Sequence, residues 1–115
     1  MTPTEFRKMA LELPEVAASS HMQHPDFRVG GKIFATLGYP NKDFAMVKLT
    51  LDEQELFVQI DPKAFQPVPG GWGRQGATRV LLKSAKKSVV RDALRAAWTL
   101  RAPKKIADGA GRLPR

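Results

Sequence analysis

The sequence contains no cysteine and no long hydrophobic run. Without cysteine the chain has no disulfide framework, no thiol nucleophile and no thiolate ligand for a metal. No apolar run approaches the roughly 20 residues that a membrane-spanning helix needs. The first residues, MTPTEFRKMALELPE, lack the apolar stretch behind a basic start that marks a secretory signal. We therefore expect no membrane segment and a cytoplasmic location.

The length and composition fit one globular domain. The chain has 115 residues, of which 43% are hydrophobic and 26% charged, values that are ordinary for a soluble domain. A chain of this length builds one core rather than two. We expect the domain to cover residues 1–105, and residues 106–115 to form a basic, flexible tail because glycine and proline interrupt them.

Acidic residues are scarce in the second half of the chain. Residues 1–61 contain six Lys and Arg against nine Asp and Glu, a balance of −3. Residues 62–115 contain thirteen against two, a balance of +11. A basic surface of this kind attracts polyanions, because it releases counterions from phosphates. The alternative is that the charge serves only solubility.

Residues 19–50 predict a meander of short antiparallel strands. Gly30 and Gly31 are typical of a two-residue hairpin turn. In the strand after this turn, Ile33, Ala35 and Leu37 alternate on one face, and a later strand alternates in the same way. The predicted strands cover residues 26–29, 32–37 and 44–49, with a connector over residues 15–25, and a further strand is expected over residues 78–83.

Three helices are expected around this sheet. Thr2 and Glu5 have the spacing of a capping box, and so do Thr50 and Glu53. These caps predict helices that run to Leu13 and over residues 51–60, and Ser84 is the expected cap of a last helix that reaches Arg101. The side chains expected to be buried are Phe6, Met9, Ala10 and Leu13 in the first helix, Leu56, Phe57 and Ile60 in the second, and Val90, Leu94, Ala97 and Trp98 in the last.

A glycine-rich loop over residues 67–77 surrounds Trp72 and Arg74. Its string GWGRQG matches the dinucleotide fingerprint G-x-G-x-x-G, but that fingerprint follows a strand and opens a helix. Here the glycines lead into a strand, so we reject a dinucleotide site. Trp72 either folds back to fill the core under the loop or stays on the surface to stack on a ligand.

His21, His24 and Asp26 are the side chains closest to a metal or acid–base pattern. A metal site normally needs three or four converging ligands, and this segment is not one helical face. Local hydrogen bonding of both histidines is the alternative. Ser19 and Ser20 beside His21 invite a nucleophile–base interpretation, but no G-x-S-x-G motif or third member accompanies them. We expect no catalytic site, no metal and no cofactor.

The segments HPDFRVGGKIFATL, DFAMVKL and PVPGGWG, followed by TRV and a closing helix, resemble the MmcQ/YjbR family. The resemblance covers residues 4–105. It implies an α+β fold in which helices pack on an antiparallel sheet of four to five strands, with a shape related to the frataxin-like (CyaY-like) fold. Family members have been described with a double-wing motif and are commonly labelled DNA-binding. Lys32, Lys48 and Trp72 match the family's lysine and tryptophan positions.

Iron binding is not implied by this resemblance. Frataxin uses an acidic ridge, whereas the last helix here is basic and the first carries only Glu5 and Glu12.

The sequence leaves two functional hypotheses open, both for a monomer. The first is a DNA-binding protein that makes mainly phosphate contacts. Its expected contact residues are Lys32, Lys48, Arg74, Arg79, Lys83, Lys87, Arg91 and Arg95. The second is a non-catalytic protein that binds a small planar metabolite in an apolar pocket on the sheet face, near His24 and Trp72, with Lys32, Lys48 or His24 orienting the ligand.

Overall fold

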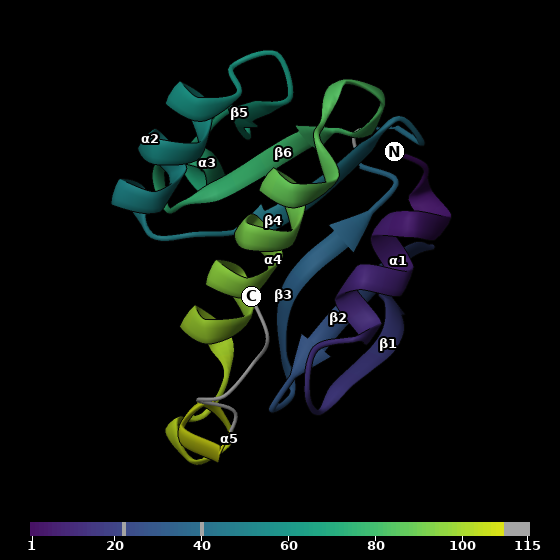
Figure 1. Cartoon of the computed structure of the whole chain (residues 1–115), viewed down its shortest axis with the longest axis vertical. Helices are drawn as coiled ribbons and strands as arrows, with labels where there is room; N and C mark the ends of the chain where they lie inside the picture. The colour runs from purple at the N-terminus through teal and green to yellow at the C-terminus, as the bar shows by residue number, and fades with distance from the viewer. Residues whose placement is uncertain (22, 40, 110–115) are drawn as a thin grey trace.

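The computed structural model describes residues 1–21, 23–39 and 41–109. Within these residues it is an α+β fold with one antiparallel sheet of six strands, in the order β1-β2-β3-β4-β6-β5 (Figure 1). The elements are α1 (Pro3–Leu11), β1 (Val16–His21), β2 (His24–Val29), β3 (Lys32–Leu37), β4 (Phe44–Lys48), α2 (Leu51–Ile60), β5 (Phe65–Pro67), α3 (Gly71–Arg74), β6 (Ala77–Leu81), the 3₁₀ helix η1 (Leu82–Ser84), α4 (Lys87–Arg101) and α5 (Lys104–Gly109).

Both predicted capping boxes are present. Thr2 Oγ1 accepts from the Glu5 N–H at 3.1 Å, while Glu5 Oε1 accepts from the Thr2 N–H at 2.9 Å. Thr50 and Glu53 repeat this arrangement at the start of α2. Each box satisfies backbone donors that a helix start leaves unpaired. The caps therefore fix where both helices begin, and α2 has the predicted bounds.

The connector predicted before the sheet is wrong. Val16–His21 form the edge strand β1, which pairs with β2 from Val16↔Val29 to His21↔His24. The sequence VAASSH carries no alternation, and residues 17–20 are exposed on both faces. Such a segment becomes a strand through its backbone pairing, which a hydrophobic pattern does not reveal.

A β-bulge changes which residues of β3 face the core. The register with β2 shifts between Phe27 and Arg28, so Phe34 is the extra residue of β3. A bulge places two consecutive side chains on one side of the strand. Phe34 and Ala35 are both buried, whereas Ile33 is only half-buried. The predicted alternation of Ile33, Ala35 and Leu37 is therefore wrong at Ile33, which lies on the opposite face.

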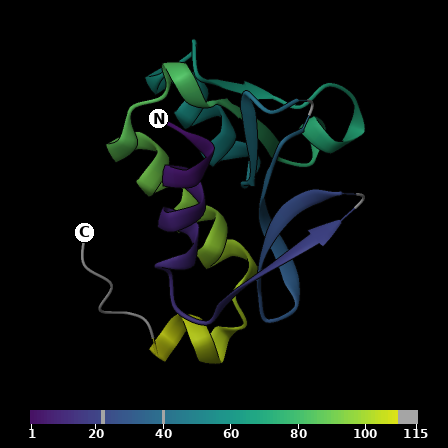
Figure 2. The same ribbon diagram turned by 90° about the vertical axis from the view of Figure 1, so that its right-hand side faces the viewer.

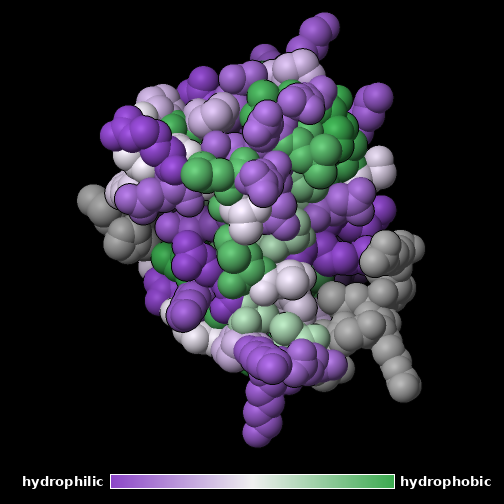
Figure 3. Space-filling model, turned by 90° about the vertical axis from the view of Figure 1, so that its left-hand side faces the viewer, coloured by the Kyte–Doolittle hydropathy of each residue, from purple (hydrophilic) through white to green (hydrophobic). Residues whose placement is uncertain are grey.

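Two of the three side chains expected to be buried in α2 are exposed. Phe57 packs in the core, stacked on Phe65, but Leu56 and Ile60 are 51% and 54% exposed. The polar Gln54 is buried in their place. Hydrophobic side chains gather toward the upper right of Figure 3, which shows the side of the molecule where α2 lies. The helix thus docks through a narrow stripe on the end of the sheet.

The last helix begins later than predicted. Ser84 belongs to η1, and α4 starts after Lys86, which makes no side-chain cap. The predicted buried stripe of Val90, Leu94, Ala97 and Trp98 is confirmed. The indole N–H of Trp98 donates to the Pro14 carbonyl at 2.9 Å, which fixes the chain between α1 and β1 on α4.

The helices α1 and α4 cover one face of the sheet. α4 packs across β3 and β4, and α1 packs against α4 and β1 (Figures 1 and 2). Between these layers lies the core, whose largest buried side chains are Trp98, Phe6, Phe27, Phe34 and Phe65. Among the described residues, no such layer of long helices covers the opposite face of the sheet, which we call the open face. In Figure 2, α3 and the β1–β2 hairpin extend on this side.

Part of the segment expected to be a flexible tail is helical. Lys104–Gly109 form α5, and Ile106 and Ala107 pack against the core. The rest of the expected tail, residues 110–115, lies outside the described residues. No helix in the described part of the chain is long and apolar enough to cross a membrane.

We predict that the ion pair between Lys87 of α4 and Glu5 of α1 stabilises the fold in a pH-dependent way. Hydrogen bonds from Lys87 and from the Thr2 backbone lower the pKa of Glu5 from 4.5 to about 2. A carboxylate whose pKa falls on folding stabilises the protein above its unfolded pKa, and this contribution is lost as the pH falls through the folded pKa. Lys87→Met should therefore lower the urea midpoint at pH 7, and the difference from wild type should shrink between pH 4.5 and pH 2.

The control is Lys86→Met, which removes a neighbouring exposed lysine at the same end of α4. Both substitutions remove one positive charge near the helix N-terminus, but only Lys87→Met breaks the ion pair with Glu5. Lys86→Met should therefore change the midpoint less at pH 7. An equal loss for Lys87→Met at pH 2 and pH 7 would show that the side chain acts through packing rather than charge.

Candidate functional site

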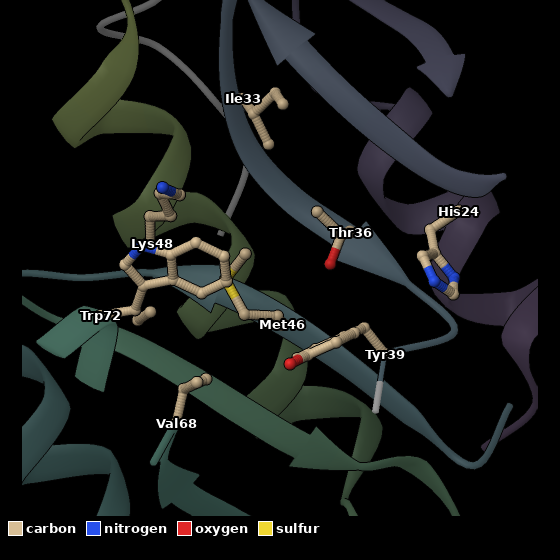
Figure 4. Close-up of a pocket in the computed structure, with 9 residues that line it drawn as sticks. His24, Ile33, Thr36, Tyr39, Met46, Lys48, Val68 and Trp72 are labelled. Carbon is tan, nitrogen blue, oxygen red and sulfur yellow. The ribbon is translucent and has the colours of Figure 1, made fainter. Parts of the chain in front are cut away.

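The open face contains a cavity of about 350 Å³. Alternation along β4 sends Ala45 and Val47 into the core and turns Met46 and Lys48 toward this cavity. Beside them, Ile33 and Thr36 project from β3, and Ala77 from the start of β6. The full lining is His24, Ile33, Thr36, Tyr39, Met46, Lys48, Val68, Trp72 and Ala77, most of which is labelled in Figure 4.

Aromatic rings stand at both ends of the cavity. Trp72, on α3, is 67% exposed, so it does not fill the core under its loop. With Lys48 and Met46 it lines the same part of the view in Figure 4, where its indole overlaps both side chains. Toward the other end, Tyr39 meets His24 edge to face, with ring centroids 6.0 Å apart. The cavity is therefore bounded by groups that can stack on a flat molecule.

The loop that carries Trp72 is held by a buried glutamine. Gln54 Nε2, on α2, donates to the carbonyls of Gly73 and Ala77 at 3.0 and 3.1 Å, and to Thr78 Oγ1 at 3.2 Å. Gly73 packs so tightly that a Cβ there would lie 1.8 Å from the Val68 carbonyl oxygen. These contacts fix the path of the backbone under Trp72, although the indole itself is exposed.

Positive charge predominates near the cavity. Burial and the charge of Arg101 both lower the pKa of Lys48. Asp26, which is fully buried, accepts from Arg28 Nε and Nη2 at 2.9 and 3.1 Å, and this pairing raises the pKa of Arg28. The one carboxylate of β2 is thus already paired with its neighbour.

Two further predicted cations lie on or above the open face. Arg79 pairs with Met46 across β6 and β4, and its guanidinium stands 5.5 Å from the centroid of the Phe44 ring. Arg74 is exposed on α3, two residues after Trp72. Lys48, Arg74 and Arg79 therefore share one side of the molecule with the aromatic lining.

The remaining predicted cations lie elsewhere. Lys32 is exposed at the start of β3, and Lys83 is exposed on η1. The row Lys87, Arg91 and Arg95 lies on α4, across the sheet from the cavity. Within this row Lys87 pairs with Glu5, and Arg95 is half-buried with contacts of its own. The structure does not bring the eight cations predicted from the sequence into one surface.

The histidine and serine patterns do not form a reactive cluster among the described side chains. Asp26 is bonded to Arg28, and His24 contacts Tyr39. Ser19 and Ser20 are exposed on β1, and the side chain of His21 lies outside the described part. Within that part, no three His, Asp or Glu residues gather as metal ligands.

Of the residues that the sequence suggested for a pocket, His24, Lys48 and Trp72 line the cavity and Lys32 does not. Most of the lining was missed. The alternation in β4 was a usable signal for Met46, because it puts that residue on the same face as Lys48. Ile33 was assigned to the wrong face because of the bulge. Tyr39 and Val68 lie in the segments just after β3 and β5, where no periodic pattern indicates which way a side chain points.

These features define an α+β protein whose helices cover one face of an antiparallel sheet and whose open face carries an aromatic-lined pocket. Residues 11–100 match the YjbR family, and the chain belongs to that family. The crystal structure of Deinococcus radiodurans protein DR2400, of domain DUF419, has a similar fold, with a TM-score of 0.74 and 18% identity over 98% of this chain and 89% of that one. No curated protein matches the chain.

We predict that Gly73→Ala disturbs the loop under Trp72. Because its Cβ would overlap the Val68 carbonyl, the backbone must shift, and overpacking of this kind costs about 1–3 kcal/mol. Urea unfolding should show this loss of stability. Gly71→Ala is the matched control on the same short helix, since its Cβ would meet only Arg74 Nη2, at 3.6 Å. Equal stabilities of the two variants would contradict the tight packing of Gly73.

Proposed function

We propose that the protein binds a small planar molecule in the pocket of the open face. The observation that carries this proposal is a cavity of about 350 Å³ whose walls combine an exposed tryptophan with apolar and polar side chains. Ligand sites are typically concave and mostly apolar, with a few polar groups that orient the ligand, and their volumes start at about 300 Å³. The cavity has this composition and this size.

The lining suits a flat ligand. Trp72 offers a ring face, while Met46 and Ile33 supply apolar contacts below it. In Figure 4 the Thr36 hydroxyl points toward the space between Met46 and Tyr39, and the Tyr39 hydroxyl points toward Met46 and Val68. A planar body can be buried against the apolar groups while its polar substituents meet these hydroxyls, so hydrogen bonding would choose among ligands of similar shape.

Duplex DNA is the second candidate, favoured by the cations that share the open face. Lys48, Arg74 and Arg79 lie there with Trp72. Lys87, Arg91 and Arg95 lie on α4 across the sheet. A straight duplex contacts one side of a small protein, so these two sets belong to alternative binding surfaces. Phosphate contacts by either set would give affinity without a choice of sequence.

The first test is a titration of planar bicyclic compounds, including 2-naphthamide and 2-naphthoate, by isothermal titration calorimetry. Stacking on an aromatic side chain contributes about 1–3 kcal/mol, so Trp72→Ala should weaken any bound member of the panel by about fivefold or more. Leu56→Ala, which truncates an exposed side chain on α2, should leave the affinity unchanged. Absence of binding by every compound, or equal binding by Trp72→Ala, would overturn the proposal.

The second test is fluorescence anisotropy of a labelled duplex of about 20 base pairs at salt concentrations from about 50 to 200 mM. If the open face binds DNA, the double variant Arg74→Glu and Arg79→Glu should weaken binding and reduce the salt slope by about 2. Arg91→Glu on α4 is the matched charge reversal on the other side. A loss confined to Arg91→Glu would move the interface to α4, and no binding at the lowest salt would exclude this candidate.

A further inference from the structure

The two edge strands of the sheet differ in how their outer sides are protected. β5, at one edge, has only three residues, ends in Pro67 and packs against α2. β1, at the other edge, has six residues and pairs only with β2 in the described part of the chain (Figure 1). An edge strand presents unpaired backbone N–H and C=O groups, and proteins usually shorten or cover such a strand or place proline or lysine in it. β5 has these protections.

The composition of β1 leaves its outer side open to another backbone. Its sequence, VAASSH, contains no proline, lysine, arginine or acidic residue. Residues 17–20 are exposed, and their alanine and serine side chains are small. The pairing of β1 with β2 runs along the whole strand without a bulge. A strand of this length that carries neither a charge nor a bulge is a template for further strand pairing.

A second copy of this chain fits this edge better than an extended peptide of another protein. Domains that add a peptide strand to their sheet select it through pockets for alternate side chains. Because residues 17–20 are exposed on both faces of β1, the described residues form no walls beside the strand for such pockets. A second β1 needs no pockets, since two identical antiparallel strands exchange their backbone hydrogen bonds symmetrically.

The distribution of charge also favours β1 as the contact between two copies. Each copy carries a net charge of +8, so a contact through the basic part of the chain would bring like charges together. β1 lies at the opposite end of the sheet from β5 and β6. On the neighbouring strand β2, Asp26 and Arg28 already neutralise each other. Contact through β1 therefore joins two copies at an uncharged strand.

We propose that two copies of this chain associate through β1, which pairs antiparallel with the β1 of the other copy and joins the two six-stranded sheets into one. The two-fold axis of such a pair is normal to the sheet, so the open faces of both copies lie on the same side. One short strand is a small interface, so the dimer is weak and depends on protein concentration. The monomer expected from the sequence took no account of this edge, because β1 was not predicted to be a strand.

The first test is sedimentation velocity at protein concentrations from about 1 µM to about 1 mM, the range in which weak complexes dissociate. The sedimentation coefficient should rise with concentration from the value of a monomer toward that of a dimer. The dimer should form at a lower protein concentration in about 0.5 M salt than in about 0.05 M salt, because salt screens the repulsion between the two chains. A monomer at every concentration would overturn the proposal.

Amide hydrogen exchange, measured on the unaltered chain, locates the interface. A second strand protects the outward amides of β1, so exchange in residues 16–21 should slow as the protein concentration rises, while exchange in β5 should not change. If slower exchange appears elsewhere and β1 is unchanged, the copies associate through another surface and the proposal is wrong.

Two double variants assign the association to β1. Ser19→Lys with Ser20→Lys places one lysine on each face of the strand. Across the two-fold axis these lysines approach their equivalents, and the like charges should weaken the dimer about tenfold. Ser84→Lys with Ser88→Lys is the matched control, which adds the same charge at exposed serines of η1 and α4 and should weaken the dimer much less. Equal dimerisation of the two double variants would contradict the proposal, and the exchange measurement still tests it if the first double variant does not fold.

Discussion

The orientation of the candidate site depends on the buried side-chain amide of Gln54. A buried amide is costly unless it is hydrogen-bonded, and this one donates to Gly73, Ala77 and Thr78. Through these bonds α2 holds the loop of α3 against the start of β6. The rest of α2 is shallowly docked, with Leu56 and Ile60 exposed. α2 therefore contributes little to the core, and its main role is to hold in place the segment that carries Trp72.

The second constraint is that the two faces of the sheet have different roles. α1 and α4 bury the core face, so the fold is stabilised largely from that side. The open face carries side chains that are only half-buried, such as Met46, Lys48 and Ile33. The bulge in β3 adds to the difference between the two faces. It places Phe34 and Ala35 together on the core face, so that Ile33 lies on the open face and lines the pocket.

The net charge of +8 acquires a different meaning once the residues are placed. The cations that make the second half of the chain so basic are separated by the sheet. Arg74 and Arg79 lie on one side of it, and Arg91 lies on the other. One of the lysines on α4 is used internally, in the ion pair with Glu5. Lys48 lines the pocket from β4, and burial, together with the charge of Arg101, lowers its pKa.

The sequence by itself determined the α+β class, both capping boxes, the buried stripe of α4 and the alternation in β4, because each depends on residues close along the chain. It also indicated His24, Lys48 and Trp72 as candidate pocket residues. Only the tertiary structure decided that β1 is a strand, that Gln54 is buried and that Ile33 faces outward. These features depend on pairing and packing between distant segments, which local patterns do not encode.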